Sequence, residues 1–160
     1  MALRQMESKR VTVGDNDFYL RPFPAFKAAN LTGELASVLA PVIGVLAPIV
    51  GDSNVMDVDV TKAAEALSGV SVIDGDRLEI LMKKLLLGGN IVIEYVDENG
   101  ERQQERLERD LADEVFCGNV QDMFVLCVHV IKLNFSGFFE KLATLSGKAE
   151  QVAKAPRKIL

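Results

Sequence analysis

The alternation of hydrophobic and polar residues predicts two β-hairpins. Val11-Thr12-Val13 and Phe18-Tyr19-Leu20 are short β-prone runs on either side of a Gly-Asp-Asn-Asp turn. A second pair of runs flanks Asn99-Gly100, which is the strongest short-range turn signal in the chain. The pattern therefore predicts strands at residues 11–13, 18–20, 91–96 and 101–107.

Apolar residues at a three-four spacing predict helices over most of the remaining chain. The spacing gives a helix over about 24–40, which Pro41 ends or kinks before a second apolar helix continues to Val50. Met123 to Ile131 has only His129 as a polar residue, and a strand is the alternative to a helix there. We expect that helix to break at Ser136-Gly137. The other expected helices cover about 61–67, 74–87 and 110–116.

These elements predict a mainly α fold of the α+β class, a helical domain with two small β-hairpins. At 160 residues the chain is long enough to bury one core. We expect residues 1–146 to form a single globular domain. Residues 147–160 are polar, rich in small residues and interrupted by Pro156, which predicts a flexible basic C-terminal tail.

Charge and composition limit the class of partner. The net charge of −5 argues against general nucleic-acid binding, which favours a basic surface. Residues 94–114 hold nine acids against three arginines, whereas residues 141–160 hold five lysines and arginines against one glutamate. Such blocks are solvated faces or form an electrostatic contact between protomers. The N-terminal residues lack an apolar signal segment and only two cysteines occur, which indicates a reducing, cytosolic compartment.

The stretch VLAPVIGVLAPIVG, residues 38–51, repeats one seven-residue phrase without any charge. It could span a membrane, form a buried core helix or stay accessible for a partner. Pro41 and Pro48 would each leave a backbone carbonyl unsatisfied in lipid, which argues against a membrane span. The seven-residue period aligns Leu39 with Leu46 on one line of the helix surface, and this stripe favours self-association or capture of an apolar partner helix.

No combination of residues indicates an enzyme. His129 is the single histidine and lies in the most apolar segment, where a hydrogen-bonded core histidine is expected. Cys117, Cys127 and His129 are too few and too poorly spaced for a structural zinc site, and no phosphate-binding glycine loop occurs. We predict no catalytic, cofactor-binding or metal-binding residues. An enzyme or small-molecule binder with a cleft near His129 remains the alternative.

Aromatic residues gather near the two ends of the chain. Phe18, Tyr19, Phe23 and Phe26 lie in the first thirty residues, and Phe135, Phe138 and Phe139 lie in the last thirty. These side chains either pack on each other as core or add to a surface that contacts a partner.

Two long stretches carry a resemblance to a known family. FYLRPFPAFKAANLTGELASVLAPVIGVLAPIVG (18–51) and DLADEVFCGNVQDMFVLCVHVIKLNFSGFF (110–139) resemble the tail assembly chaperones of long-tailed bacteriophages and prophages. The intervening MDVDVTKAAEALSGVSVIDGDRLEILMKKLLLGG is also similar to the middle of that family. The resemblance implies a small, mostly helical, non-enzymatic protein of the host bacterial cytoplasm that is not expected in the mature virion.

The resemblance also implies partners. In that family the protein binds the long, hydrophobic, helical tape measure protein, helps recruit tail tube subunits and often self-associates. A longer form is often made by frameshifting, and the tail from Gly147 resembles a linker to such an extension. We expect the contacts with the tape measure protein or a second copy to be made by apolar residues of the repeated phrase and of the two aromatic groups. These residues are Phe23, Phe26, Leu39, Val42, Ile43, Leu46, Phe135, Phe138 and Phe139. No membrane partner is expected. A virion structural component, such as a tail-completion or connector protein, is the alternative function.

Overall fold

The computed structural model describes residues 7–39 and 75–154, which form four strands and four helices. The strands are β1 (Lys9–Val13), β2 (Asn16–Leu20), β3 (Ile91–Val96) and β4 (Arg102–Arg106). The helices are α1 (Ala25–Leu39), α4 (Gly75–Leu86), α5 (Arg109–Val115) and α6 (Val120–Lys154). The helices expected at 42–50 and 61–67 lie outside the described residues.

The two hairpins join into one antiparallel sheet in the order β1-β2-β3-β4. Both predicted turns are confirmed: Gly14 and Gly100 adopt φ values of 61° and 78°, which glycine tolerates better than other residues. The sequence did not predict the pairing of β2 with β3, in which Phe18 lies opposite Ile93 and Leu20 opposite Ile91. The description as a mainly α domain with two separate small hairpins therefore fits only in part. The fold is a mixed α+β arrangement around a continuous sheet.

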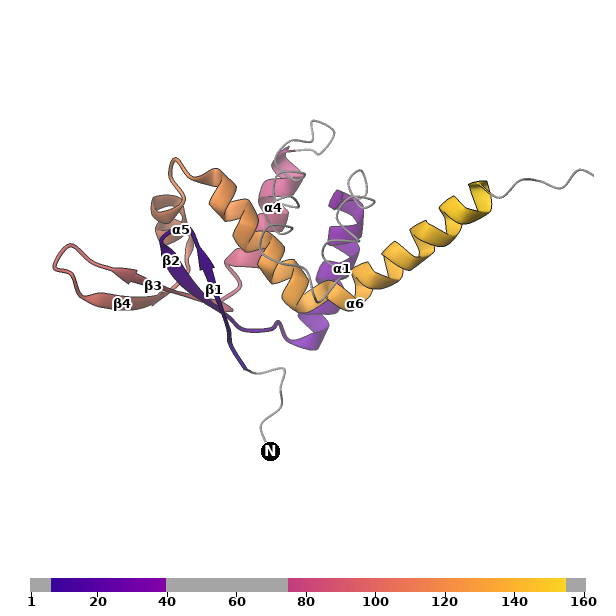
Figure 1. Ribbon diagram of the computed structural model, residues 1–160. Coiled ribbons are helices and arrows are strands. Elements are labelled where there is room, and N and C mark those ends of the chain that lie inside the picture. Colours follow the sequence, from indigo (N-terminus) through magenta and orange to yellow (C-terminus); the bar gives the residue numbers. More distant parts are fainter. Residues whose placement is uncertain (1–6, 40–74, 155–160) are drawn as a thin grey trace, which may run out of the picture.

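The hydrophobic core lies between one face of this sheet and the helices. Alternate strand residues such as Val11, Phe18 and Ile93 are buried, because successive side chains of a strand point to opposite faces. The ring of Phe18 stacks on that of Phe116, with the centroids 5.9 Å apart. Figure 1 shows α1, α4 and α6 grouped beside the sheet. The first half of α6 supplies much of the core, including the fully buried Leu126 and Val130.

Helix α6 corrects the prediction of a break at Ser136-Gly137, because it continues without interruption to Lys154. A glycine inside a helix costs only about 1 kcal/mol relative to alanine, which the helix-forming residues on both sides can offset. Glycine and serine pairs are common sites of helix bending. Figure 1 shows α6 changing direction about midway along its length, and Ser136-Gly137 lies at the middle of its range.

The C-terminal half of α6 extends away from the other described elements (Figure 1). The backbone of residues 147–154 is helical, although the sequence places the start of a flexible tail at residue 147. The domain boundary at residue 146 stays a prediction.

None of the helices among residues 7–39 and 75–154 is long and apolar enough to cross a membrane. The repeated phrase at residues 38–51 begins at the end of α1, and its residues from 40 onward lie outside the described part of the chain.

The burial of two phenylalanines gives a direct test of this core. Phe18 is fully buried, whereas 92% of Phe26 is exposed. We expect Phe18→Ala to lower the free energy of unfolding by about 3–5 kcal/mol, because it removes a ring from a closely packed core. Phe26→Ala is the matched control and should change it by no more than about 0.5 kcal/mol. Urea titration followed by circular dichroism measures both values, and similar losses in the two variants would contradict this core.

Candidate partner-binding surfaces

Phe23 and Phe135, two of the predicted contact residues, are buried against each other. Their ring centroids lie 6.4 Å apart with the planes tilted by 46°. The backbone N–H of Phe23 donates to the side-chain oxygen of Asn134 at 2.8 Å, and the ammonium of Lys27 lies 4.8 Å from the centre of the Phe23 ring. This arrangement matches the alternative that the terminal aromatics pack on each other. In the described chain these two rings attach the middle of α6 to the segment that leads into α1.

Phe26 occupies the first turn of α1 and is exposed to solvent over 92% of its surface. A phenylalanine ring gains roughly 1.5–3 kcal/mol on full burial, so a partner that covered Phe26 would gain much of this free energy. Leu39 and the pair Phe138 and Phe139 lie within α1 and α6, respectively. Val42, Ile43 and Leu46 lie outside the described residues. Their roles as contacts stay predictions.

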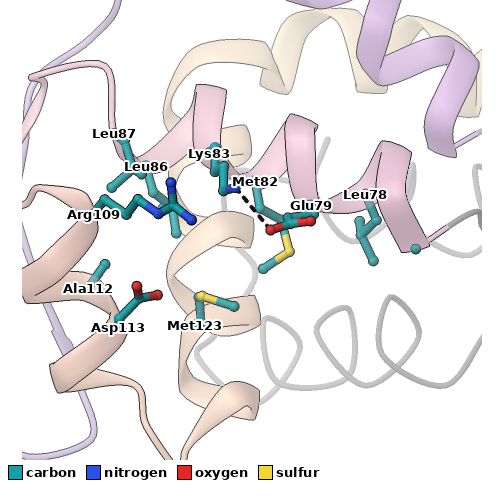
Figure 2. A pocket seen from close by; sticks show the side chains of 11 residues that line it. Leu78, Glu79, Met82, Lys83, Leu86, Leu87, Arg109, Ala112, Asp113 and Met123 are labelled. Atoms are coloured by element: carbon teal, nitrogen blue, oxygen red, sulfur yellow. Dashed lines mark ion pairs between the residues drawn. The ribbon is translucent and has the colours of Figure 1, made fainter.

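A pocket that the sequence did not predict opens between α4, α5 and the start of α6, and we call it the α4–α6 pocket. It has a volume of about 220 Å³. Figure 2 shows its side chains converging from the three helices, with the sulfur atoms of Met82 and Met123 among them. The apolar residues that line it are Leu78, Met82, Leu86, Leu87, Ala112 and Met123.

Charged side chains complete the lining of the α4–α6 pocket. Lys83 pairs with Glu79 one turn earlier on α4 at 2.9 Å, and Arg109 and Asp113 lie across from them on α5 (Figure 2). Small-molecule sites usually measure about 300–1,000 Å³, so this pocket is small for a cofactor. Engineered apolar cavities of about 150 Å³ hold a benzene molecule. The pocket is therefore suited to one apolar side chain of another polypeptide, and its flexible methionines can adapt to different shapes.

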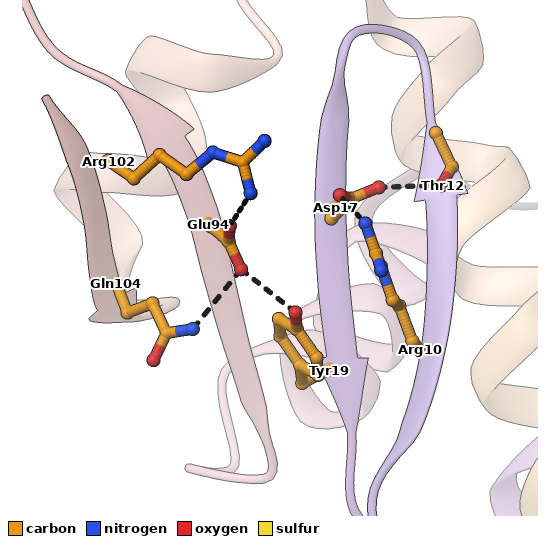
Figure 3. Close-up of polar contacts among 7 residues, drawn as sticks. All are labelled: Arg10, Thr12, Asp17, Tyr19, Glu94, Arg102 and Gln104. Carbon is orange, nitrogen blue, oxygen red and sulfur yellow. Dashed lines mark hydrogen bonds and ion pairs between the residues drawn. The ribbon is translucent and has the colours of Figure 1, made fainter. Parts of the chain in front are cut away.

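The outer face of the sheet carries a separate polar cluster, shown in Figure 3. Glu94 accepts hydrogen bonds from the Tyr19 hydroxyl at 2.8 Å, from Gln104 at 3.1 Å and from Arg102 at 3.2 Å. The bond from Tyr19 contributes most to holding the pKa of Glu94 below its usual value. A hydrogen bond from Thr12, followed by one from Arg10, likewise lowers the pKa of Asp17. These carboxylates stay ionised and link neighbouring strands, which is a structural role.

The histidine and the two cysteines lie apart from the α4–α6 pocket. No cluster of three or more His, Cys, Asp or Glu side chains could hold a metal among residues 7–39 and 75–154. His129 is half-buried on α6. Burial raises the pKa of the Cys127 thiol well above its ordinary value, so this cysteine stays protonated, whereas Cys117 is exposed. The α4–α6 pocket is lined by neither cysteine nor by His129.

Comparison with known proteins gives one family. Residues 14–147 match a family described as "phage tail assembly chaperone protein, TAC". This match confirms the resemblance that the sequence carries, and it covers β2, β3, β4, α1, α4, α5 and most of α6. Neither the curated proteins nor the solved structures give a match.

The polar cluster on the sheet makes a prediction about pH. Tyr19→Phe removes the hydroxyl that donates to Glu94, so the pKa of Glu94 should rise toward 4.5, the ordinary value. A lowered folded-state pKa stabilises the fold above pH 4.5, and this stabilisation is lost as the pH falls through the folded value. The free energy of unfolding should therefore fall less steeply on acidification in Tyr19→Phe than in the unmodified protein.

Carboxyl carbon NMR of Glu94 against pH measures this shift directly. Thr12→Val is the matched control, because Thr12 donates to Asp17 and not to Glu94. An unchanged Glu94 titration in Tyr19→Phe would contradict the cause that we assign.

Proposed function

The chain belongs to the phage tail assembly chaperone family, and from this premise we propose that it binds the tape measure protein and helps recruit tail tube subunits during tail morphogenesis. The observation that supports tape measure binding best is the α4–α6 pocket, an open apolar pocket on the helical side of the domain. The exposed ring of Phe26 adds a second apolar contact on α1.

The physical problem is to keep a long hydrophobic helix soluble before the tail tube covers it. An apolar stripe on a helix presents side chains at three-four spacing, and such side chains enter pockets on a receiving surface one at a time. The α4–α6 pocket has the volume for one such side chain. Its charged lining residues would face the polar flank of the bound helix and let the complex stay hydrated.

The proposed role is non-enzymatic and uses no cofactor. It is supported by the family and by the hydrogen bonds that engage Glu94 and Asp17 in holding the sheet together. We place the protein in the host bacterial cytoplasm and outside the mature virion. A virion structural component is the second candidate function. Mass spectrometry of mature particles separates the two, because a chaperone should be nearly missing from them and a structural component should be present.

Self-association is part of the proposal. The heptad pair at residues 38–51 begins in the last turn of α1, and on a helix its seven-residue period would place Leu39, Val42, Ile43 and Leu46 along one apolar line. A second copy or the tape measure protein would cover this line. Leu46→Asp should then weaken the association more than it lowers the free energy of unfolding, which light scattering and urea titration measure on the same sample. If Leu46→Asp simply unfolds the protein, residue 46 is part of the core.

Co-expression with a cognate tape measure protein tests the main proposal. We expect more soluble tape measure protein and co-purification of the two chains. Leu78→Glu places a charge at the half-buried wall of the α4–α6 pocket and should reduce the co-purified amount by about tenfold, as expected for the loss of an apolar anchor. Val96→Glu is the matched control on an exposed residue at the end of β3 and should have no effect.

The proposal is contradicted if the tape measure protein stays insoluble and does not co-purify, although the unmodified protein is folded and present in excess.

A further inference from the structure

A second pocket lies between the start of α1 and the end of α4, and we call it the lysine pocket. It has a volume of about 430 Å³. Its lining residues come from both helices and from the two residues that follow α4: Lys27, Asn30, Leu31, Lys83, Lys84, Leu87 and Gly88. Three of these residues are lysines, and none of the described residues that line the pocket is acidic. The pocket is therefore a concentration of positive charge on a chain whose net charge is −5.

The three lysines keep the capacity to bind a further anion. Lys83 pairs with Glu79 at 2.9 Å, and the lysine side chain is still 42% exposed. Lys84 pairs with Glu34 and is 44% exposed, and the Lys27 ammonium donates a long hydrogen bond of 3.5 Å to a backbone carbonyl. Each ammonium carries three donors, and exposed pairs of this kind contribute little to stability. An incoming carboxylate can therefore share these donors.

The turn between β3 and β4 carries the opposite charge. Residues 97–101, which we call the acidic tip, contain Asp97, Glu98 and Glu101 and no basic residue. Asp97 accepts hydrogen bonds from the backbone N–H groups of Asn99 and Glu101, each at 2.9 Å. The bond from Glu101 contributes most to holding the pKa of Asp97 below its usual value, so this carboxylate is ionised. Glu98 and Glu101 are exposed on a turn that these bonds already fix, which lowers the entropic cost of binding.

The acidic tip cannot reach the lysine pocket of its own chain. Figure 1 shows the turn between β3 and β4 projecting from the sheet on the side away from α1. The strands on either side of the turn are paired up to Val96 and Arg102, so the tip has a fixed position on the domain. The two charged surfaces can therefore meet only between two copies. Each copy has one tip and one pocket, so such a contact is head-to-tail and leaves a free tip and a free pocket at the ends.

We propose that the lysine pocket receives the acidic tip of a second copy of this chain. Charge complementarity supports this occupant, because the tip holds its carboxylates in one exposed turn and three lysines line one pocket. The contact gives the acidic block at residues 94–114 a role that the proposed function does not assign. It is separate from the apolar line at residues 38–51, and it does not depend on tape measure binding.

The proposed contact is weak between two copies that are free in solution. A turn buries little surface, and salt weakens exposed ion pairs. The negative net charge of both copies also opposes their approach. Copies held side by side on one long partner would have a high effective concentration for each other, which would populate the contact there. A head-to-tail contact then allows one copy to follow another along such a partner.

Sedimentation velocity of the full-length protein tests the contact. We expect association in about 20 mM salt that is lost in about 500 mM salt, where the screening length falls to about 4 Å. Glu98→Gln/Glu101→Gln should weaken the low-salt association by about fivefold, because it removes two exposed ion pairs. Glu108→Gln/Glu114→Gln is the matched control, with the same change of net charge at two exposed acids outside the tip. It should leave the association unchanged or slightly stronger, because it lowers the repulsion between copies.

A mixture of two variants tests the head-to-tail geometry. Lys27→Gln/Lys84→Gln keeps the tip and impairs the pocket, whereas Glu98→Gln/Glu101→Gln keeps the pocket and impairs the tip. Each variant alone should associate about fivefold more weakly than the unmodified protein, but an equimolar mixture should form dimers with one copy of each. Neither Lys27 nor Lys84 lines the α4–α6 pocket, so both variants should still co-purify with the tape measure protein. Loss of self-association and loss of co-purification therefore report on different proposals.

Four results would overturn the proposal. Association that persists in high salt would make apolar residues the contact between copies. Equal weakening by the tip variant and its matched control would mean that charge anywhere in the acidic block has the same effect. A mixture no larger than the separate variants would rule out the head-to-tail contact. An unmodified protein that stays monomeric in low salt at close to millimolar concentration would show that the contact does not form.

Melting temperatures separate these effects from a loss of folding. Both variants at exposed acids should melt with the unmodified protein, because surface substitutions of this kind change stability little. If Lys27→Gln/Lys84→Gln melts at a lower temperature, the salt dependence and the tip variant with its matched control decide the outcome.

Discussion

The pairing of β2 with β3 is the interaction on which the rest of the domain depends. It joins two hairpins that lie some seventy residues apart in sequence, with Phe18 opposite Ile93 and Leu20 opposite Ile91. All four of these side chains are fully buried. Without this pairing each hairpin would present a two-stranded ribbon, which is marginally stable in water. With it, the sheet gains a hydrophobic face wide enough to pack against the helices.

Helix α6 then connects this sheet to everything on the helical side. Its buried first half packs on β1 and on both α1 and α4, and Asn134 links it to the segment before α1. The Asn134 amide also donates to the Val130 carbonyl one turn earlier, so both ends of this side chain are satisfied. Ion pairing of Lys84 with Glu34 ties α4 to α1. Two of the three helices that line the α4–α6 pocket, α4 and α6, are therefore each held by an element outside the pocket.

Residue patterns within short stretches of the sequence predicted the turns and helices well, but they did not predict which strands pair. Asn99-Gly100 specified its turn because glycine adopts the required positive φ there at little cost. The stripe of Leu81, Met82, Leu85 and Leu86 correctly predicted a helix, and all four are buried. The pairing of β2 with β3 was not predictable, because alternation identifies the buried face of a strand but not its neighbour.

The candidate surfaces show the same limit. Phe23 and Phe26 are three residues apart and alike in sequence, yet one is buried and the other is exposed. The difference depends on Phe135, which meets Phe23 from the far end of the chain. The α4–α6 pocket went unpredicted for a related reason, since an apolar stripe does not reveal which part of it the neighbouring helices leave uncovered. The break expected at Ser136-Gly137 relied on residue preference alone, which the continuity of α6 outweighs.

Strand β4 also has a consequence for how copies of this domain can meet. It lies at an edge of the sheet, and its sequence is Arg-Gln-Gln-Glu-Arg. Two copies related by a twofold axis could extend the sheet by pairing their β4 strands in antiparallel fashion, with paired residues on the same face. If Gln104 lies opposite Gln104 of the other copy, Arg102 lies opposite Arg106. If Glu105 lies opposite Glu105, the two glutamates face each other. Like charges directly opposite destabilise strand pairs. This edge therefore disfavours growth of the sheet into a fibre through β4, because each such pairing sets like charges against each other.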